Sequence, residues 1–96
     1  MPTAFKISSP FNQVTEIKQA LREARRADQL VEQSSIRTFQ VFRALKFDEP
    51  AGPPSAIDRT SRGHDQLAEA RVALKDTIHQ LEKILQQGGY TLPARD

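Results

Sequence analysis

The fold is decided by the stretch KFDEPAGPPSAIDRTSRG, residues 46–63, which lies between two long amphipathic runs. It holds three of the six prolines and two of the four glycines in the chain. Pro50, Pro53 and Pro54 stop a helix, because proline lacks the backbone N–H and the residue before it avoids the helical region. A linker between domains would need a core on each side, and neither run can bury its apolar stripe alone. We therefore interpret residues 48–54 as the bend of a hairpin.

The run before the bend predicts one long helix from about residue 10 to about residue 47. At about 100° per residue its apolar side chains fall in one arc, which keeps its phase along the whole run. These side chains are Val14, Ile17, Leu21, Ala24, Ala27, Val31, Phe39, Phe42 and Leu45. Ser9 suits the N-cap and Pro10 suits the first helical position. The alternative is a break at Ser34-Ser35, which would give three helices.

The run after the bend predicts a second helix from about residue 55 to about residue 87, followed by a short tail over residues 88–96. Its apolar residues recur every three or four positions, as on a helix that faces a core. They are Leu67, Ala70, Leu74, Ile78, Leu81 and Leu85. The start is ambiguous, because SAID at residues 55–58 has the form of a capping box and Gly63 weakens the helix. Gly88 and Gly89 are a C-terminal stop signal.

Together these runs predict an all-α protein, an antiparallel helical hairpin of two long amphipathic helices in a single domain over residues 1–96. The numbers of facing residues should then add up to about 103. Phe5, Ile7 and Phe11 should meet Tyr90 and Leu92 at the open end. One seam covers only part of each apolar stripe, so we expect the hairpin to complete a four-helix bundle by dimerisation or by binding a partner.

Polar residues interrupt both stripes. Asp28, Ser35 and Thr38 lie inside the first, and Arg71 lies on the edge of the second. The hairpin places Arg71 level with Glu32 and one turn from Asp28. A charge at a partly buried position must be paired, so we interpret these three residues as an ion pair that fixes the register. A polar site inside a bundle is the alternative.

Two surface features are candidates for binding a partner. The first is a basic ridge on the first helix, which consists of Lys18, Arg22, Arg25 and Arg26. It could bind an acidic protein or, as a second reading, nucleic acid, although a solvated face is the simplest explanation. The second is formed by Leu30 and Val41, which share one side of the first helix outside its apolar stripe.

The chemistry of an enzyme is not evident in the sequence. There is no cysteine, and the two histidines lie about 22 Å apart along one helix, too far to share a metal. Asp76 and His79 are spaced like half of a di-metal motif, but there is no second copy. We found no phosphate-binding loop and no nucleophile with a general base nearby. We therefore expect no enzymatic activity, no cofactor, no metal and no small-molecule substrate.

The net charge of +2 permits an acidic partner without requiring one. No apolar run is long enough to span a bilayer, and no signal peptide pattern is present. The sequence thus predicts a cytoplasmic protein-protein interaction module, such as an adaptor, assembly factor, small chaperone or subunit of a larger complex. Secretion without a cleavable signal remains open. The alternatives are a nucleic-acid-associated protein that uses the basic ridge, and a small inhibitor that masks a site on its partner.

Overall fold

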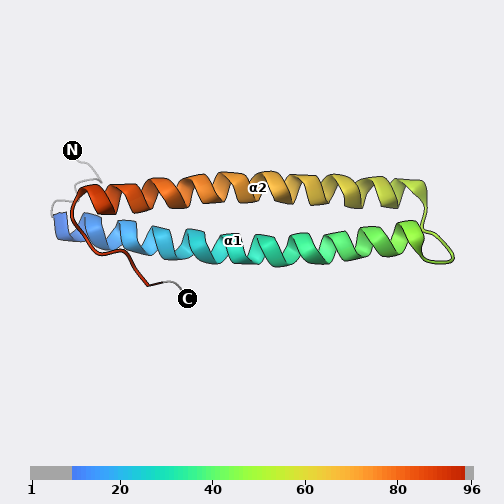
Figure 1. Ribbon diagram of the computed structural model, residues 1–96, viewed down its shortest axis with the longest axis horizontal. Coiled ribbons are helices and arrows are strands. Elements are labelled where there is room, and N and C mark those ends of the chain that lie inside the picture. The colour runs from blue at the N-terminus through green and yellow to red at the C-terminus, as the bar shows by residue number, and fades with distance from the viewer. Residues whose placement is uncertain (1–9, 95–96) are drawn as a thin grey trace, which may run out of the picture.

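The computed structural model describes residues 10–94, with side chains from residue 13 onward, and consists of two long α-helices (Figure 1). The first, α1, spans Pro10–Phe47, and the second, α2, spans Pro54–Gln87. The two helices run antiparallel and pack against each other along their length. The predicted all-α antiparallel hairpin is therefore confirmed.

The first helix is continuous. It runs through Ser34 and Ser35 without interruption, so the alternative of three helices is wrong. Serine is a weaker helix former than alanine, but the difference is a fraction of a kcal/mol per residue. Packing of the apolar stripe against α2 outweighs this preference. At about 1.5 Å per residue, the 38 residues of α1 extend over about 57 Å.

The bend occupies residues 48–53 and is held by backbone hydrogen bonds to the end of α1. The Gly52 N–H donates to the carbonyl oxygen of Leu45 at 2.7 Å, and the Asp48 N–H donates to that of Ala44 at 3.0 Å. The Glu49–Pro50 peptide bond is cis. A Cβ at Gly52 would lie 2.5 Å from Cδ2 of Leu45, closer than two carbon atoms can approach. A side chain at residue 52 would therefore require Leu45 to move.

The second helix begins at Pro54, one residue earlier than expected. Pro53 is its N-cap, with an extended backbone and no side-chain cap hydrogen bond, so the SAID stretch does not act as the capping box considered above. Proline at the first helical position costs no hydrogen bond, because that N–H has no partner within a helix. The helix continues through Gly63. It ends at Gln87 with Gly88 as its C-cap, and Gly89 follows with a φ of 78°, which is accessible mainly to glycine.

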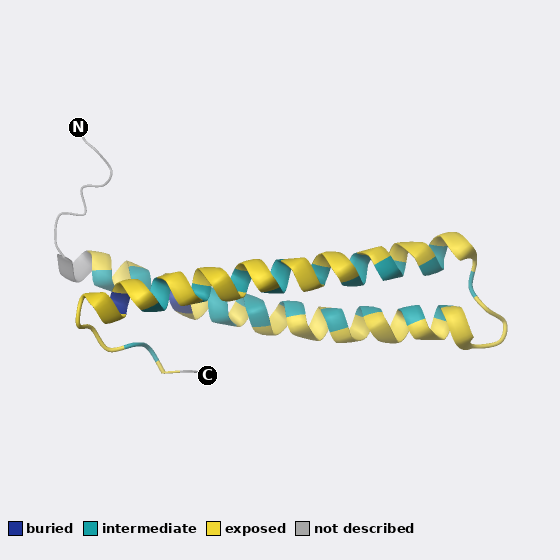
Figure 2. Cartoon of the chain, turned by 45° about the horizontal axis from the view of Figure 1, so that its top comes forward, coloured by how far each residue is buried: buried dark blue, intermediate teal, exposed yellow. Residues whose placement is uncertain are grey.

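The seam between the helices follows a seven-residue pattern in which inward positions alternate by three and four. This spacing is typical of helices that coil around each other with a left-handed twist. Figure 2 shows the less exposed residues on the facing sides of both helices. Among the described residues only Leu21 and Leu85 are fully buried, both near the open end of the hairpin. The middle of the seam is partly polar: Asp28, Ser35 and Thr38 on α1 and His64 and Arg71 on α2 take inward positions there, interspersed with Val31 and Leu67.

The tail after α2 folds back across the start of α1 (Figure 1). Leu92 and Pro93 are half-buried there, whereas Tyr90 is exposed. Phe5, Ile7 and the side chain of Phe11, which we expected against this tail, lie outside the described residues.

Candidate protein-interaction surface

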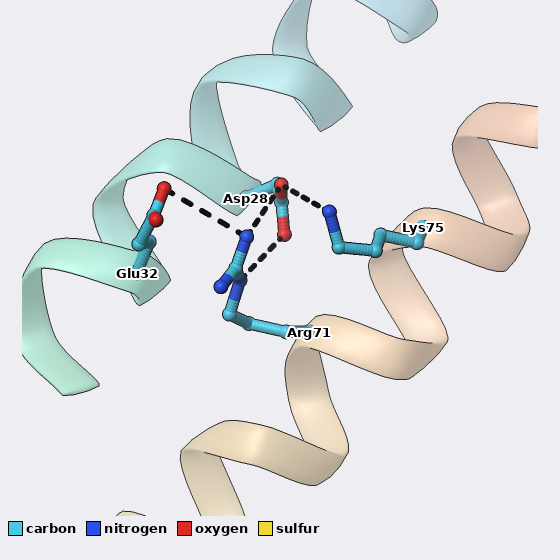
Figure 3. A network of polar contacts seen from close by, with 4 residues as sticks. All are labelled: Asp28, Glu32, Arg71 and Lys75. Carbon is cyan, nitrogen blue, oxygen red and sulfur yellow. Dashed lines mark hydrogen bonds and ion pairs between the residues drawn. The ribbon is translucent and has the colours of Figure 1, made fainter.

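A network of charged side chains joins the middle of the two helices (Figure 3). Arg71 Nε donates a hydrogen bond to Asp28 Oδ1 at 3.2 Å, and Arg71 Nη2 lies 3.7 Å from Glu32 Oε1. The structure thus brings together the three residues that the sequence suggested as a register ion pair. It adds a fourth, because Lys75 Nζ lies 3.6 Å from Asp28 Oδ2.

The surroundings of Asp28 favour its charged form. The hydrogen bond from Arg71 lowers the pKa of Asp28 below its usual value; burial opposes this effect, and the positive charges of Arg71 and Lys75 reinforce it. The same hydrogen bond raises the pKa of Arg71. Only 14% of the Asp28 side chain is exposed, so loss of its partners would leave a carboxylate with little water around it. The pairing therefore favours the one register in which α2 presents Arg71 to Asp28.

A second cross-helix pair lies nearer the open end. Arg25 Nη2 is 2.9 Å from Glu82 Oε2, and Arg25 Nη1 donates to the carbonyl oxygen of Pro93 at 2.8 Å. This arginine thereby ties α1 to both α2 and the tail. Only 15% of its side chain is exposed, so Arg25 is not displayed with the rest of the basic ridge. Sequence reasoning missed the pair, although Arg25 and Glu82 hold equivalent flanking positions in their seven-residue patterns.

The remaining members of the basic ridge differ in exposure. Arg22 and Arg26 are exposed on α1, whereas Lys18 is half-buried. The ridge therefore presents two exposed guanidinium groups rather than four cations.

These ion pairs define a charged side of the hairpin, which consists of Arg25 and Glu32 from α1 and Lys75 and Glu82 from α2. A groove of about 490 Å³ runs along it. Its lining includes His79, which is exposed, and Ile78. Within residues 10–94, no three histidine or acidic side chains lie close enough together to hold a metal ion.

The opposite side of the seam carries no charged residue at its flanking positions. In an antiparallel helix pair, matching positions of the two seven-residue patterns lie on the same flank of the seam. The charged residues occupy one matching set, so the other matching set lies together on the opposite flank. The flanking positions of this uncharged side are Ala20, Ala27, Ser34 and Val41 on α1 and Gly63, Ala70, Thr77 and Ile84 on α2, and Leu30 and Ala73 lie in the rows just outside them.

Large apolar side chains are exposed on the uncharged side. Leu30 is 57% exposed, Ile84 49% and Val41 43%. The structure thus leaves Leu30 and Val41, the two apolar residues singled out in the sequence, accessible on one side of α1. The other exposed apolar residues are scattered: Val72 points outward from α2 and is 71% exposed, and Phe39 packs against the His64 ring at a centroid distance of 5.4 Å.

Comparisons of the chain with protein-family models, with curated proteins and with solved structures found no match. Neither helix of the described chain is long and apolar enough to cross a membrane. The case for a function therefore rests on the side chains themselves.

Proposed function

We propose that this protein is a non-enzymatic protein-protein interaction module, which contributes two helices to a four-helix bundle. In the preferred form of this proposal, a second copy of the chain supplies the other two helices. In the alternative, a different protein supplies them. The same activity would serve an adaptor, an assembly factor, a small chaperone or a subunit of a larger complex. A small inhibitor that masks a site on its partner would use the same surface.

The observation that carries the proposal is the shortage of buried core. Only Leu21 and Leu85 are fully buried in the described chain, while eight large apolar side chains are exposed. The accessible surface is 7085 Å², whereas a compact monomer of 10.8 kDa exposes about 5,500 Å². The difference, about 1,500 Å², is more than the roughly 800 Å² that each partner of a standard protein-protein interface removes from water.

The charged groups of the groove support a structural role rather than catalysis. Arg25, Asp28, Lys75 and Glu82 each lie within 4 Å of an opposite charge on the other helix. A general acid or base must instead reach a substrate and hold a pKa near the working pH. The direction of the Asp28 pKa shift is the reverse of what a general base at neutral pH would need.

A protein partner is favoured over nucleic acid. Engagement of Arg25 with Glu82 leaves Arg22 and Arg26 as the accessible arginines of the basic ridge. Nucleic-acid binding usually draws on a larger basic surface, which neutralises many phosphates at once. Two guanidinium groups suit a short acidic segment of a protein better.

Co-purification of two copies tests the proposal. A tagged and an untagged chain are co-expressed, and the tagged copy is captured on resin. We expect the untagged copy to be retained in comparable amount. If it washes away, capture from the native host with mass spectrometry tests the heteromeric alternative. Failure to retain the second copy, together with no stoichiometric host protein, would refute the proposed function.

A further inference from the structure

The two flanks of the seam are unequal as docking surfaces. Docking a second hairpin on the charged side would cover Glu32 and Lys75, whose side chains are 52% and 61% exposed, and removing such charges from water is costly unless each finds a new partner. Docking on the uncharged side buries alanine, serine and threonine together with Leu30, Val41 and Ile84, and leaves Glu23 and Arg37 at its outer edge. The uncharged side is therefore the better docking surface, because burying its apolar side chains is favourable and its desolvation costs less than that of the charged side.

The order of residues along the outer edge of this side in α1 is self-complementary. Glu23, Leu30 and Arg37 follow one another at seven-residue intervals and so lie in one row. All three are exposed, and neither Glu23 nor Arg37 makes an ion pair within the described residues. If a second α1 lies antiparallel with Leu30 against Leu30, each Glu23 meets Arg37 of the second copy. A parallel arrangement would place like charges together.

The matching row on α2 has the same symmetry. Gln66, Ala73 and Gln80 also follow one another at seven-residue intervals, so an antiparallel α2 pair centred on Ala73 brings each Gln66 opposite Gln80 of the second copy. The glutamines can then hydrogen-bond to each other. The small Ala73 at the centre allows a close approach.

One axis serves both rows. In the hairpin, Lys75 contacts Asp28 and Arg71 contacts Glu32, so the numbers of facing residues add up to about 103. Ala73 of α2 therefore lies level with Leu30 of α1. A single two-fold axis perpendicular to the helices can pass between the copies at this level and relate both helix pairs at once. The pairing of α1 with α2 within one hairpin does not by itself require Leu30 and Ala73, the centres of the two rows, to lie at the same level.

We infer that a second copy of this chain docks on the uncharged side about a two-fold axis at the level of Leu30 and Ala73, with each helix antiparallel to its own counterpart. The result is a four-helix bundle in which all neighbouring helices are antiparallel. This inference rests on the proposed self-association and specifies its surface. The occupant is a second copy rather than another protein because the charge order complements itself.

Charge reversal tests the pairing of Glu23 with Arg37. Glu23→Arg or Arg37→Glu alone places like charges opposite each other at two symmetric points, and we expect each to raise the dimer dissociation constant at least about tenfold. The double variant Glu23→Arg/Arg37→Glu restores opposite charges and should dimerise like the wild type. Arg43→Glu is the matched control, because Arg43 lies about a third of a turn away on α1 and faces outward. Helicity measured by circular dichroism checks that every variant folds.

Single cysteines test the position of the axis, because the chain has none of its own. Leu30→Cys places two thiols next to each other across the axis, so mild oxidation should give a disulfide-linked dimer. Val72→Cys is the control, since Val72 lies at nearly the same level but faces away from the uncharged side. If the wild type dimerises and both single charge-reversal variants dimerise equally well, this inference is overturned and the proposed self-association stands. Equal cross-linking of the Leu30→Cys and Val72→Cys variants would have the same consequence. A monomeric wild type would overturn both.

Discussion

Leu21→Ala is the change that should most weaken the hairpin. Leu21 is fully buried, and Leu85 is the only other described residue of which this is true. Replacing a buried leucine by alanine costs about 2–5 kcal/mol, depending on how far the surroundings collapse into the cavity. A seam between two helices is open at its flanks and can close partly, so we expect a cost at the lower end, about 2–3 kcal/mol.

That cost is a large fraction of the free energy of unfolding of the whole protein. A chain of 96 residues has a free energy of unfolding of about 5–14 kcal/mol. The melting temperature should fall by about 10–20 °C, since 1 kcal/mol corresponds to about 4–8 °C for a domain of this size.

Urea titration followed by circular dichroism measures the change, with all variants at one protein concentration because association adds to stability. Val72→Ala is the matched control: its side chain is 71% exposed, and its substitution should change the free energy by no more than about 0.5 kcal/mol. Equal effects of Leu21→Ala and Val72→Ala would show that the seam is not the core of the fold.

Three further outcomes are expected. Arg71→Ala should lower the melting temperature, because it leaves Asp28 with little water and a weaker partner, and Arg71→Lys should recover only part of the loss; an unchanged melting temperature would contradict the ion pair. Because the pKa of Asp28 is lowered in the folded state, its contribution to stability should be complete above its usual value of 3.8 and be lost as the pH falls through the lowered value; Asp28→Asn should abolish that part of the acid sensitivity in urea titrations. The double variant Arg22→Glu/Arg26→Glu should keep its helicity but capture less of an acidic partner, and undiminished capture would mean that the basic ridge is only a solvated face.

The two helices and the bend could be predicted because their signals are local. Pro50, Pro53 and Pro54 mark the bend, and the apolar arc shows no change of phase at the serines that might have divided α1. The approach of Arg71 to Asp28 followed from counting residues outward from the bend. The start of α2 was placed one residue late, because Pro54 can occupy the first helical position as well as interrupt a helix.

The function of Arg25 could not be predicted in the same way. Its neighbours along the chain are basic, and this favoured a surface ridge over a pair with Glu82, which is distant in sequence. The contact of Arg25 with the carbonyl oxygen of Pro93 depends on the path of the tail, for which the residues after Gly89 carry no periodic signal. The charged and uncharged sides could likewise not be predicted from the sequence, because only the ion pairs in the structure show which flanks of the two helices lie together.

Sedimentation equilibrium of the wild-type protein tests the central claim most directly, because it measures mass without reference to shape. Over concentrations from about 1 to 100 µM, we predict an association that reaches twice the chain mass of 10.8 kDa. The melting temperature should rise with protein concentration over the same range. A single species of 10.8 kDa at every concentration, with a cooperative melting transition independent of concentration, would contradict self-association of the chain.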